Sequence, residues 1–411
     1  MRTAPQDRTA HPSAPAPMRH GKLPSPRPAR TIVRIVLAAI AVLAVSAVSI
    51  AAIAAWDVAR SFRPSVTLVH SAGATPPTIG ALEGGVNFLV TGDDSGDGDP
   101  QYGHRGEKLN DVTMLIHLSS DHTNATIVTF PRDMRVRLSQ CPMGGGKVSG
   151  TSILPMNNAF TYGGLPCVAK VVEDLTGLTI SYAANVGFDG AVKIAGIIGG
   201  VQVCVAEPLV DRYSGLNLPA GEQTISGSQA VAFLRSRHGI GDGSDLGRIS
   251  NQQLFFSAMV RQTRSQLSNL PQLYEIAKVA ASSMTLTSNL ENLNTLVSIA
   301  LAFKDIDFDK IVFVQYPNHY ATAADGKSQV VVTEDAAHIL DTALQADRPV
   351  LLTGSVSGQQ QSTQVDPNAP TATASRTPPN PSNSADVPVP LPATVTGQTA
   401  AEQTCTRAYH F

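Results

Sequence analysis

Arginine and aspartate side chains are concentrated in residues 233–253, FLRSRHGIGDGSDLGRISNQQ. This stretch places three arginines and two aspartates around a glycine-rich turn: Arg235, Arg237, Arg248, Asp242 and Asp245. A guanidinium group has a permanent charge and a planar fork of donors that suits phosphate oxygens. Ser244 or Asp245 can cap a helix that follows, and a helix N-terminus adds partial positive charge. The stretch therefore predicts a phosphate or pyrophosphate site. The alternative is a solvated loop in which Arg and Asp pair with each other.

Three short apolar runs predict strands that have charged residues at their ends: residues 85–91, 111–118 and 125–130. The first leads into a turn with two carboxylates, Asp93 and Asp94, and the third runs directly into Arg132 and Asp133. Because α/β sheets bind their ligands at strand ends, Arg132 is a candidate site residue. The alternative is an ordinary salt bridge at the end of a strand.

The rest of the chain alternates between strand and helix patterns. Further strands are expected at residues 181–186, 201–205 and 310–315. Helices are expected at residues 157–162, 167–175, 188–198, 227–234, 246–266, 270–281, 289–303 and 335–344. We expect residues 134–150 to be irregular and residues 216–221 to form a turn. The alternation predicts the α/β class with a mixed sheet.

Composition divides the 411 residues into globular and non-globular parts. Residues 1–34 are basic and rich in Pro, Ala and Ser, which predicts a disordered arm. Residues 35–56 are uncharged and apolar, long enough to span a bilayer, and the basic flank would keep the N-terminus in the cytoplasm. A cleaved signal peptide is the alternative. We expect a stalk at residues 57–84, a catalytic domain at 85–350 and a Ser/Thr/Pro-rich disordered extracellular tail at 351–411.

Charge and cysteine content exclude two classes of function. The net charge of −2 argues against a general nucleic-acid binder, which would show a basic domain. The four cysteines have no CxxC spacing, so a zinc site is not expected: Cys141, Cys167, Cys204 and Cys405. A location outside the cell allows disulfides, and the sequence leaves three full pairings open.

Nine motifs in order resemble the LytR–CpsA–Psr family, in the form found in its actinobacterial branch. They are GDDS, NDVTMLIHL, FPRD, NNAFTYGG, FDG, GGV, LPAG, RSRH and SDLGRISNQQ, between residues 86 and 264. The resemblance implies an α/β/α sandwich with a mixed central sheet and a hydrophobic lipid-binding groove, preceded by a single transmembrane helix. It also implies an enzyme that moves a glycopolymer from a polyprenyl-pyrophosphate carrier to peptidoglycan outside the cell membrane, forming a phosphodiester and releasing polyprenyl phosphate.

The resemblance implies roles for individual residues. Mg²⁺ would be held by Asp94 and Asp111. Pyrophosphate would be bound by residues that match the family's arginines and glutamine: Arg132, Arg235 or Arg237, Arg248 and Gln252. The catalytic residues would be Arg132, Asp111 and Asp245, and the general base stays open between the two aspartates.

The chain departs from the family where arginines are common. It has Gly96 and Leu109 at two such positions, and Asn251 directly before the glutamine. Either the metal neutralises more charge, or Arg105 or Lys108 substitutes. Two other functions stay open: a polyprenyl-phosphate-binding envelope protein or regulator without catalysis, and a lipid pyrophosphatase that uses water as acceptor.

Overall fold

The computed structural model describes residues 28–68, 80, 82–93, 109–142, 147–354, 363–367 and 387–409. The chain divides between Arg60 and Ser61 into two compact units. The described part of the first unit lies in helix α1 (Pro28–Ser61), whose segment Ile32–Ser49 is long and apolar enough to cross a membrane. This helix suggests a single membrane anchor.

Helix α1 extends beyond the predicted span of residues 35–56 at both ends. Proline is tolerated in the first turn of a helix, and after Pro28 neither Pro nor Gly occurs until Pro64. The predicted stalk is also wrong near its start, because residues 62–68 join the second unit. There, the amide of Val66 donates to Leu286 O at 2.9 Å, and Leu68 is buried.

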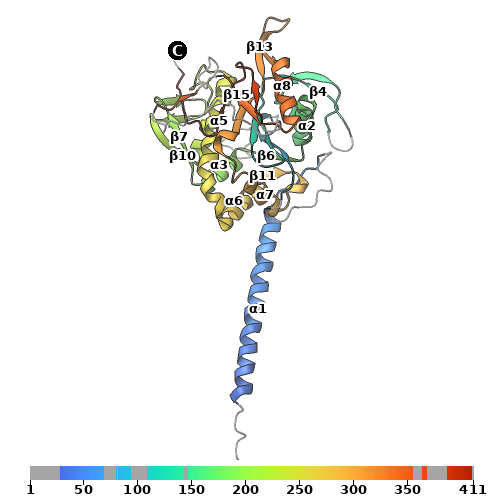
Figure 1. Cartoon of the computed structure of the whole chain (residues 1–411), viewed down its shortest axis with the longest axis vertical. Helices are drawn as coiled ribbons and strands as arrows, with labels where there is room; N and C mark the ends of the chain where they lie inside the picture. The colour runs from blue at the N-terminus through green and yellow to red at the C-terminus, as the bar shows by residue number, and fades with distance from the viewer. Residues whose placement is uncertain are drawn as a thin grey trace, which may run out of the picture. The chain divides into compact units, whose positions relative to one another are not determined.

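A seven-stranded mixed sheet forms the centre of the second unit (Figure 1). Its strands lie in the order β11 (Met284–Leu286), β6 (Tyr182–Val186), β1 (Val86–Asp93), β2 (Asn110–Leu118), β3 (Ala125–Thr129), β12 (Ile311–Gln315) and β18 (Gly397–Thr399). β1 pairs in parallel with β6, and β3 with β12, whereas the other neighbours are antiparallel. The predicted mixed sheet is confirmed.

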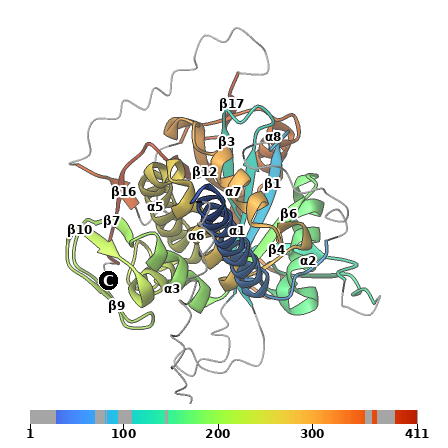
Figure 2. The ribbon, with the colours of Figure 1, turned by 90° about the horizontal axis from the view of Figure 1, so that it is seen from below.

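Helices cover both faces of this sheet. They are α2 (Asn158–Thr176), α3 (Phe188–Ile197), α4 (Gly227–Arg235), α5 (Asp245–Thr263), α6 (Leu270–Ser283), α7 (Leu293–Ala302) and α8 (Glu334–Gln345). Leu89, Leu115 and Val128 pack in one core with α2 and α8, whereas Met114 and Ile127 pack in another core with α5 and α7. Figure 2 shows α2 and α5 on opposite sides of β1, β3 and β12. The predicted α/β/α sandwich is therefore confirmed.

A second, four-stranded sheet lies beside the sandwich. Its order is β10 (Gly221–Ile225), β7 (Val201–Val205), β19 (Thr404–Thr406) and β16 (Thr363–Val365). Side chains of β7 and β10 share a core with α3, α4 and α5. A hairpin of β8 (Leu209–Asp211) and β9 (Leu216–Leu218) also contributes to this core, so the turn predicted at residues 216–221 begins with a strand.

Other short elements correct the sequence-based prediction. Residues 134–150, expected to be irregular, contain β4 (Arg135–Leu138), which pairs with β5 (Ser152–Pro155). The two helices expected at residues 157–162 and 167–175 form one kinked helix, α2, with non-helical backbone at Gly163 and Gly164. Further elements are β13 (Asn318–Thr322), β14 (Ser328–Val332), and the 3-10 helices Arg264–Ser268, Ser288–Leu290 and Phe308–Lys310. Strands of three to five residues are too short to show a clear period of two.

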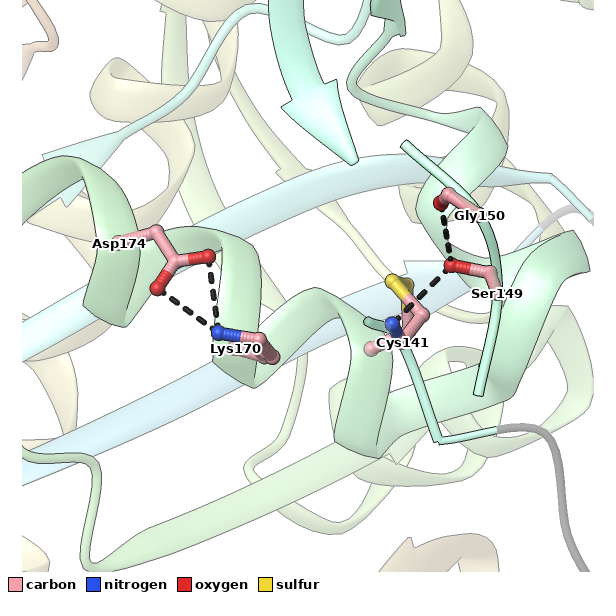
Figure 3. Close-up of a disulfide and its surroundings, with 6 residues drawn as sticks. Cys141, Ser149, Gly150, Lys170 and Asp174 are labelled. Atoms are coloured by element: carbon pink, nitrogen blue, oxygen red, sulfur yellow. Dashed lines mark hydrogen bonds and ion pairs between the residues drawn. A yellow bond between two sulfur atoms is a disulfide. The ribbon is translucent and has the colours of Figure 1, made fainter. Parts of the chain in front are cut away.

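The C-terminal segment is part of the fold, so the predicted disordered tail is wrong for residues 363–367 and 387–409. β15 (Val350–Leu352) pairs with β17 (Val389–Leu391), β18 completes the central sheet, and β19 lies between β7 and β16. The structure contains two disulfides, which correspond to one of the three pairings that the sequence left open. Cys141 bonds to Cys167 in α2 (Figure 3), and Cys204 in β7 bonds to Cys405 in β19.

We predict that the double substitution Cys204→Ser/Cys405→Ser lowers the free energy of unfolding by about 2–5 kcal/mol. This bond links residues 201 positions apart and restricts the unfolded chain accordingly. Urea denaturation of the oxidised protein measures the effect. The matched control is Cys141→Ser/Cys167→Ser, whose separation of 26 residues predicts a smaller loss. An unchanged midpoint for the first variant would contradict the prediction.

Candidate active site

Four charged side chains from three parts of the chain meet at one end of the central sheet. Arg132 Nη1 donates to Asp111 Oδ1 at 2.6 Å, and its Nε lies 3.2 Å from Asp245 Oδ1. Arg248 Nη2 lies 2.7 Å from the same Asp245 oxygen and donates to the backbone oxygen of Asp111 at 3.1 Å. Asp245 therefore bridges two guanidinium groups that lie more than a hundred residues apart in sequence.

Local structure places each member of this cluster. In the β1–β2 pair, Gly92 is opposite Val112 and Asp93 is opposite Asn110, so Asp111 is the extra residue of a β-bulge. Bulges re-aim a side chain away from the regular ladder, and they are common beside active sites. Arg132 follows β3 after Pro131, at a strand end as predicted.

Helix α5 supplies the other half of the cluster. Ser244 caps it by accepting a hydrogen bond from Gly247 N at 3.0 Å, which decides between the two predicted caps. Asp245, Arg248 and Gln252 then follow at intervals of three and four residues, so one face of the helix carries all three. The amide Nε2 of Gln252 donates to Leu234 O at 3.0 Å, which ties this face to the end of α4.

Burial makes the charges of this cluster costly unless they are paired. The side chain of Asp245 is 3% exposed and that of Arg248 is 5% exposed. Burial alone would lower the pKa of Arg132, but Asp245 and Asp111 raise it above its ordinary value, so this guanidinium stays charged. Arg248 Nε and Gln252 Oε1 are buried and make no hydrogen bond within the described part of the chain. A buried anion could therefore gain a donor from Arg248.

A third carboxylate lies at the outer edge of the cluster. Asp133 Oδ1 is 3.6 Å from Arg132 Nε, and its side chain is 42% exposed. Burial and the nearby charge of Asp245 raise the pKa of Asp133, while Arg132, Arg237 and Arg248 partly oppose this shift. Among the site carboxylates Asp111, Asp133 and Asp245, it is the most accessible to solvent.

The loop that carries Arg237 is held by Asp211 at the end of β8. One oxygen of Asp211 accepts hydrogen bonds from Ser236 Oγ at 2.8 Å and from Arg237 N at 3.0 Å. Burial alone would raise the pKa of Asp211, but these donors hold it below its ordinary value. Arg237 Nε donates to Gly243 O at 3.1 Å, so the arginine bridges the two ends of the glycine-rich turn. The ring of His238 packs against that of Tyr213 in a tilted arrangement, with ring centroids 4.6 Å apart.

An apolar cavity of about 420 Å³ opens beside the cluster. Its polar end contains Asp93, Asp111, Arg235, Arg248 and Gln252. The rest is lined mainly by apolar side chains of the sheet and of α3, α4, α5 and α7, including Val112, Met114, Ile194, Leu234, Phe255, Phe256 and Ala300. The guanidinium of Arg235 lies over the Phe188 ring at 4.4 Å, where both side chains line the cavity. The cavity could hold an apolar chain with a charged group at its mouth.

The structure brings together most of the predicted site residues. Asp111, Arg132, Asp245 and Arg248 form the cluster, while Arg235 and Gln252 line the cavity beside it. Arg132 and Arg237 do not line that cavity, and Arg237 lies near Asp133 at the edge of the cluster. The predicted metal ligand Asp94, and also Gly96, Arg105 and Lys108, lie outside the described residues.

Sequence reasoning missed three residues that support the site. Asp211 organises the Arg237 loop, Phe188 lies against Arg235, and Asn185 donates from its Nδ2 to Asp93 Oδ2 at 2.5 Å. Asp211 comes directly after two apolar residues, Leu209 and Val210, which was a weak signal for the end of a strand. Nothing in the sequence paired Asn185 with Asp93, because their contact depends on the parallel register of β1 and β6.

Comparisons with known proteins place the chain in one family. The pattern of the LytR_cpsA_psr family matches residues 65–346. Cell wall biosynthesis protein LcpA of Corynebacterium glutamicum is 30% identical over 260 residues, which cover 57% of this chain and 48% of the relative. The probable cell wall biosynthesis protein LcpB of the same species is 33% identical over 201 residues, which cover 47% of this chain and 45% of that protein. The chain thus spans about half the length of these curated relatives.

Solved structures share the fold. The LytR-Csp2A-Psr enzyme from Actinomyces oris aligns with a TM-score of 0.50 and 22% identity, covering 69% of this chain and 96% of that one. A protein of Streptococcus agalactiae aligns with a TM-score of 0.54 and 21% identity, covering 64% and 88%.

We predict that Asp245 and Arg248 are strongly coupled in stability. Removing either partner alone leaves a buried charge without its closest partner, at a cost of about 3–5 kcal/mol. A double-mutant cycle of Asp245→Asn and Arg248→Met should give a coupling energy of about 2 kcal/mol or more by chemical denaturation. The matched control is the exposed pair Lys170–Asp174 of α2 (Figure 3), 2.9 Å apart, whose coupling should be about 0.3–0.5 kcal/mol. Equal coupling in both cycles would refute the assignment of Asp245 as the central partner.

Proposed function

The chain belongs to the LytR–CpsA–Psr family, and from this premise we propose that it is a phosphotransferase of the cell envelope. It takes a glycopolymer from a polyprenyl-pyrophosphate carrier and transfers it to peptidoglycan. The acceptor hydroxyl gives its proton to a site aspartate, Asp111 or Asp245, and its oxygen forms a phosphodiester with the sugar-side phosphorus. The bridging P–O bond breaks, and polyprenyl phosphate leaves. The observation that carries this proposal is an arginine–aspartate cluster beside an apolar cavity, which two of its members, Asp111 and Arg248, line.

The composition of the cavity supports a lipid pyrophosphate as donor. A polyprenyl chain needs an apolar channel, and its pyrophosphate needs cations at the mouth. Arg235 and Arg248 stand at that mouth, and Arg132 lies directly behind Asp111. Transfer builds negative charge on the bridging oxygen, and fixed guanidinium groups in a buried site stabilise it. Asp245 is almost fully buried and contacts both Arg132 and Arg248, so its role in this scheme is to orient them.

The residues present fit a magnesium ion. Mg²⁺ prefers carboxylate oxygens and is bound by one or two carboxylates together with substrate phosphates. Asp93 and Asp111 line the same cavity, and Asp94 follows Asp93 directly. We assign Asp111 and Asp94 as the residues that would hold the ion. The ion would supply charge neutralisation at the pyrophosphate, which offsets the arginines that this chain lacks relative to its family.

Names of relatives support the substrate class. TagT of Bacillus subtilis, 22% identical over 213 residues, is named a polyisoprenyl-teichoic acid–peptidoglycan teichoic acid transferase. The proposed topology follows from the basic residues before α1, which favour a cytoplasmic N-terminus and a catalytic unit outside the cell membrane. The two disulfides agree with that location, since such bonds persist in oxidising compartments.

We predict that Arg132→Ala and Arg248→Ala each lower turnover about 100-fold or more, because each removes a cation from the developing charge. Release of polyprenyl phosphate and formation of polymer-linked peptidoglycan measure the reaction in the membrane-embedded full chain. Arg137→Ala is the matched control: Arg137 is an exposed arginine of β4, five residues after Arg132, and should keep full activity.

The same assay separates the alternatives. Full turnover of either arginine variant would contradict the site assignment. Release of polyprenyl phosphate without polymer on peptidoglycan would favour the lipid pyrophosphatase. Binding of polyprenyl phosphate without any product would favour an envelope protein or regulator that does not catalyse.

A separate prediction concerns the metal. Chelation with EDTA should lower turnover at least tenfold, and added Mg²⁺ should restore it, because the charge on the pyrophosphate is then neutralised again. Asp111→Asn should weaken the response to Mg²⁺, seen as a higher Mg²⁺ concentration at half-maximal rate. Turnover that is unaffected by chelation would refute the metal assignment.

A further inference from the structure

A second cavity, of about 1010 Å³, adjoins the first. Asp93 and Gly187 line both cavities, and Asn185, which donates to Asp93, lines the second. The first cavity is enclosed by α3, α5 and α7, whereas the second is lined by residues of α2 and by residues 63 and 66–68. The two helix groups cover opposite faces of the sheet (Figure 2). The second cavity therefore reaches the ends of β1 and β6 from the other side.

A disulfide and a pair of glycines shape one wall of this cavity, and neither belongs to the central sheet. The bond between Cys141 and Cys167 fastens residues 140–142 to α2, and Figure 3 shows this junction near Ser149. A Cβ atom on Gly163 would collide with Pro142 O, so only glycine allows this approach. Gly164 has φ +63°, which also favours glycine. The GG pair and the disulfide together hold the wall in place.

The lining is of mixed polarity and suits a saccharide better than a second phosphate or lipid. Cations and carboxylates are balanced, with Arg63 and Lys170 against Asp93 and Glu173. Amide and hydroxyl groups stand among them, and apolar surfaces are supplied by Phe160 and by others such as Val148, Pro142 and Pro166. Sugars present hydroxyl and amide groups at their edges and apolar ring faces, so they need both kinds of lining.

The stereochemistry of phosphoryl transfer favours the acceptor glycan over the donor glycan as the saccharide in the second cavity. Attacking and leaving oxygens lie roughly in line on opposite sides of the reacting phosphorus. In the proposed reaction the leaving polyprenyl phosphate lies in the first cavity. The acceptor hydroxyl must therefore enter from the opposite side, whereas the sugar already attached to that phosphorus occupies neither of the two in-line positions.

We infer that the second cavity is the binding site for the acceptor glycan, a peptidoglycan strand whose hydroxyl reaches the phosphate past Asp93 and Asn185. This inference rests on the proposed function and adds where the acceptor lies. The glycan of the donor presents the same kinds of groups as the acceptor glycan, and the experiment distinguishes between the two.

The test uses Val148→Trp in the full chain embedded in nanodiscs. Val148 lines the cavity and is 61% exposed, so a larger side chain can obstruct the cavity without entering the core. The matched control is Ile153→Trp. Ile153 is a similar β-branched residue, 59% exposed, in the neighbouring β5, and it does not line either cavity. Lys170→Met is a second variant, which removes a cation from the lining without filling it.

The probe is a soluble peptidoglycan oligomer released by a muramidase, titrated calorimetrically without donor. We expect Val148→Trp to weaken its binding at least tenfold and Lys170→Met to weaken it severalfold, with Ile153→Trp within twofold of the parent. Affinity for a polyprenyl-pyrophosphate disaccharide should stay within twofold in all three variants. Thermal unfolding confirms that each variant is folded.

Three results would overturn the inference. The parent protein could fail to bind the oligomer, Val148→Trp could bind it as the parent does, or Val148→Trp could weaken the donor instead, which would assign the cavity to the donor glycan. Failure of the proposed function would be seen separately, as the absence of polymer-linked peptidoglycan in the turnover assay of the parent protein, and would leave the oligomer titration as it is.

Discussion

A single buried carboxylate holds the candidate site together. Asp245 lies 3.2 Å from Arg132 and 2.7 Å from Arg248, and without it only the partly exposed Asp111 would stand between the two guanidinium groups. Buried like charges repel strongly, so the two arginines can share one pocket only because an anion lies between them. The same arrangement would suit the proposed substrate. A pyrophosphate bound beside Arg248 would meet guanidinium groups that are already oriented, which would reduce the cost of ordering them.

The sequence predicted the members of this cluster but not their contacts. A strand that runs into Arg132 and a capped helix that begins near Asp245 are local patterns, and local patterns can be found in sequence. The contact between them depends on how β3 and α5 pack, which is set by side chains far apart in the chain. The structure also distinguishes Arg235 from Arg237, which the sequence left open. Arg235 lines the cavity over Phe188, whereas Arg237 bridges the glycine-rich turn and lies near Asp133.

Prediction failed at the C-terminal segment for a physical reason. Residues 351–411 are rich in Ser, Thr, Pro and Gln, which suggests that they cannot bury enough apolar surface to fold. Among the described residues of this segment, β18 and β19 are strands of three residues whose partners lie elsewhere in the chain. β18 pairs with β12, β19 pairs with β7, and the Cys204–Cys405 bond fixes β19 to β7. The amide of Gly241 donates to Arg407 O at 3.0 Å, so this segment also supports the loop that carries Arg237.

The central sheet explains why the candidate site lies at the ends of its strands. A sheet separates the ligands on its two faces, because its backbone groups are paired and its side chains fill both surfaces. Molecules bound on opposite faces can meet only beyond the strand ends. Here β1 ends at Asp93, β2 carries the bulged Asp111 directly after its first residue, and β6 ends just before Gly187, which lines both cavities. If an apolar chain binds on one face and a saccharide on the other, their reacting groups would therefore meet at these strand ends, beside the charges that can stabilise the transfer.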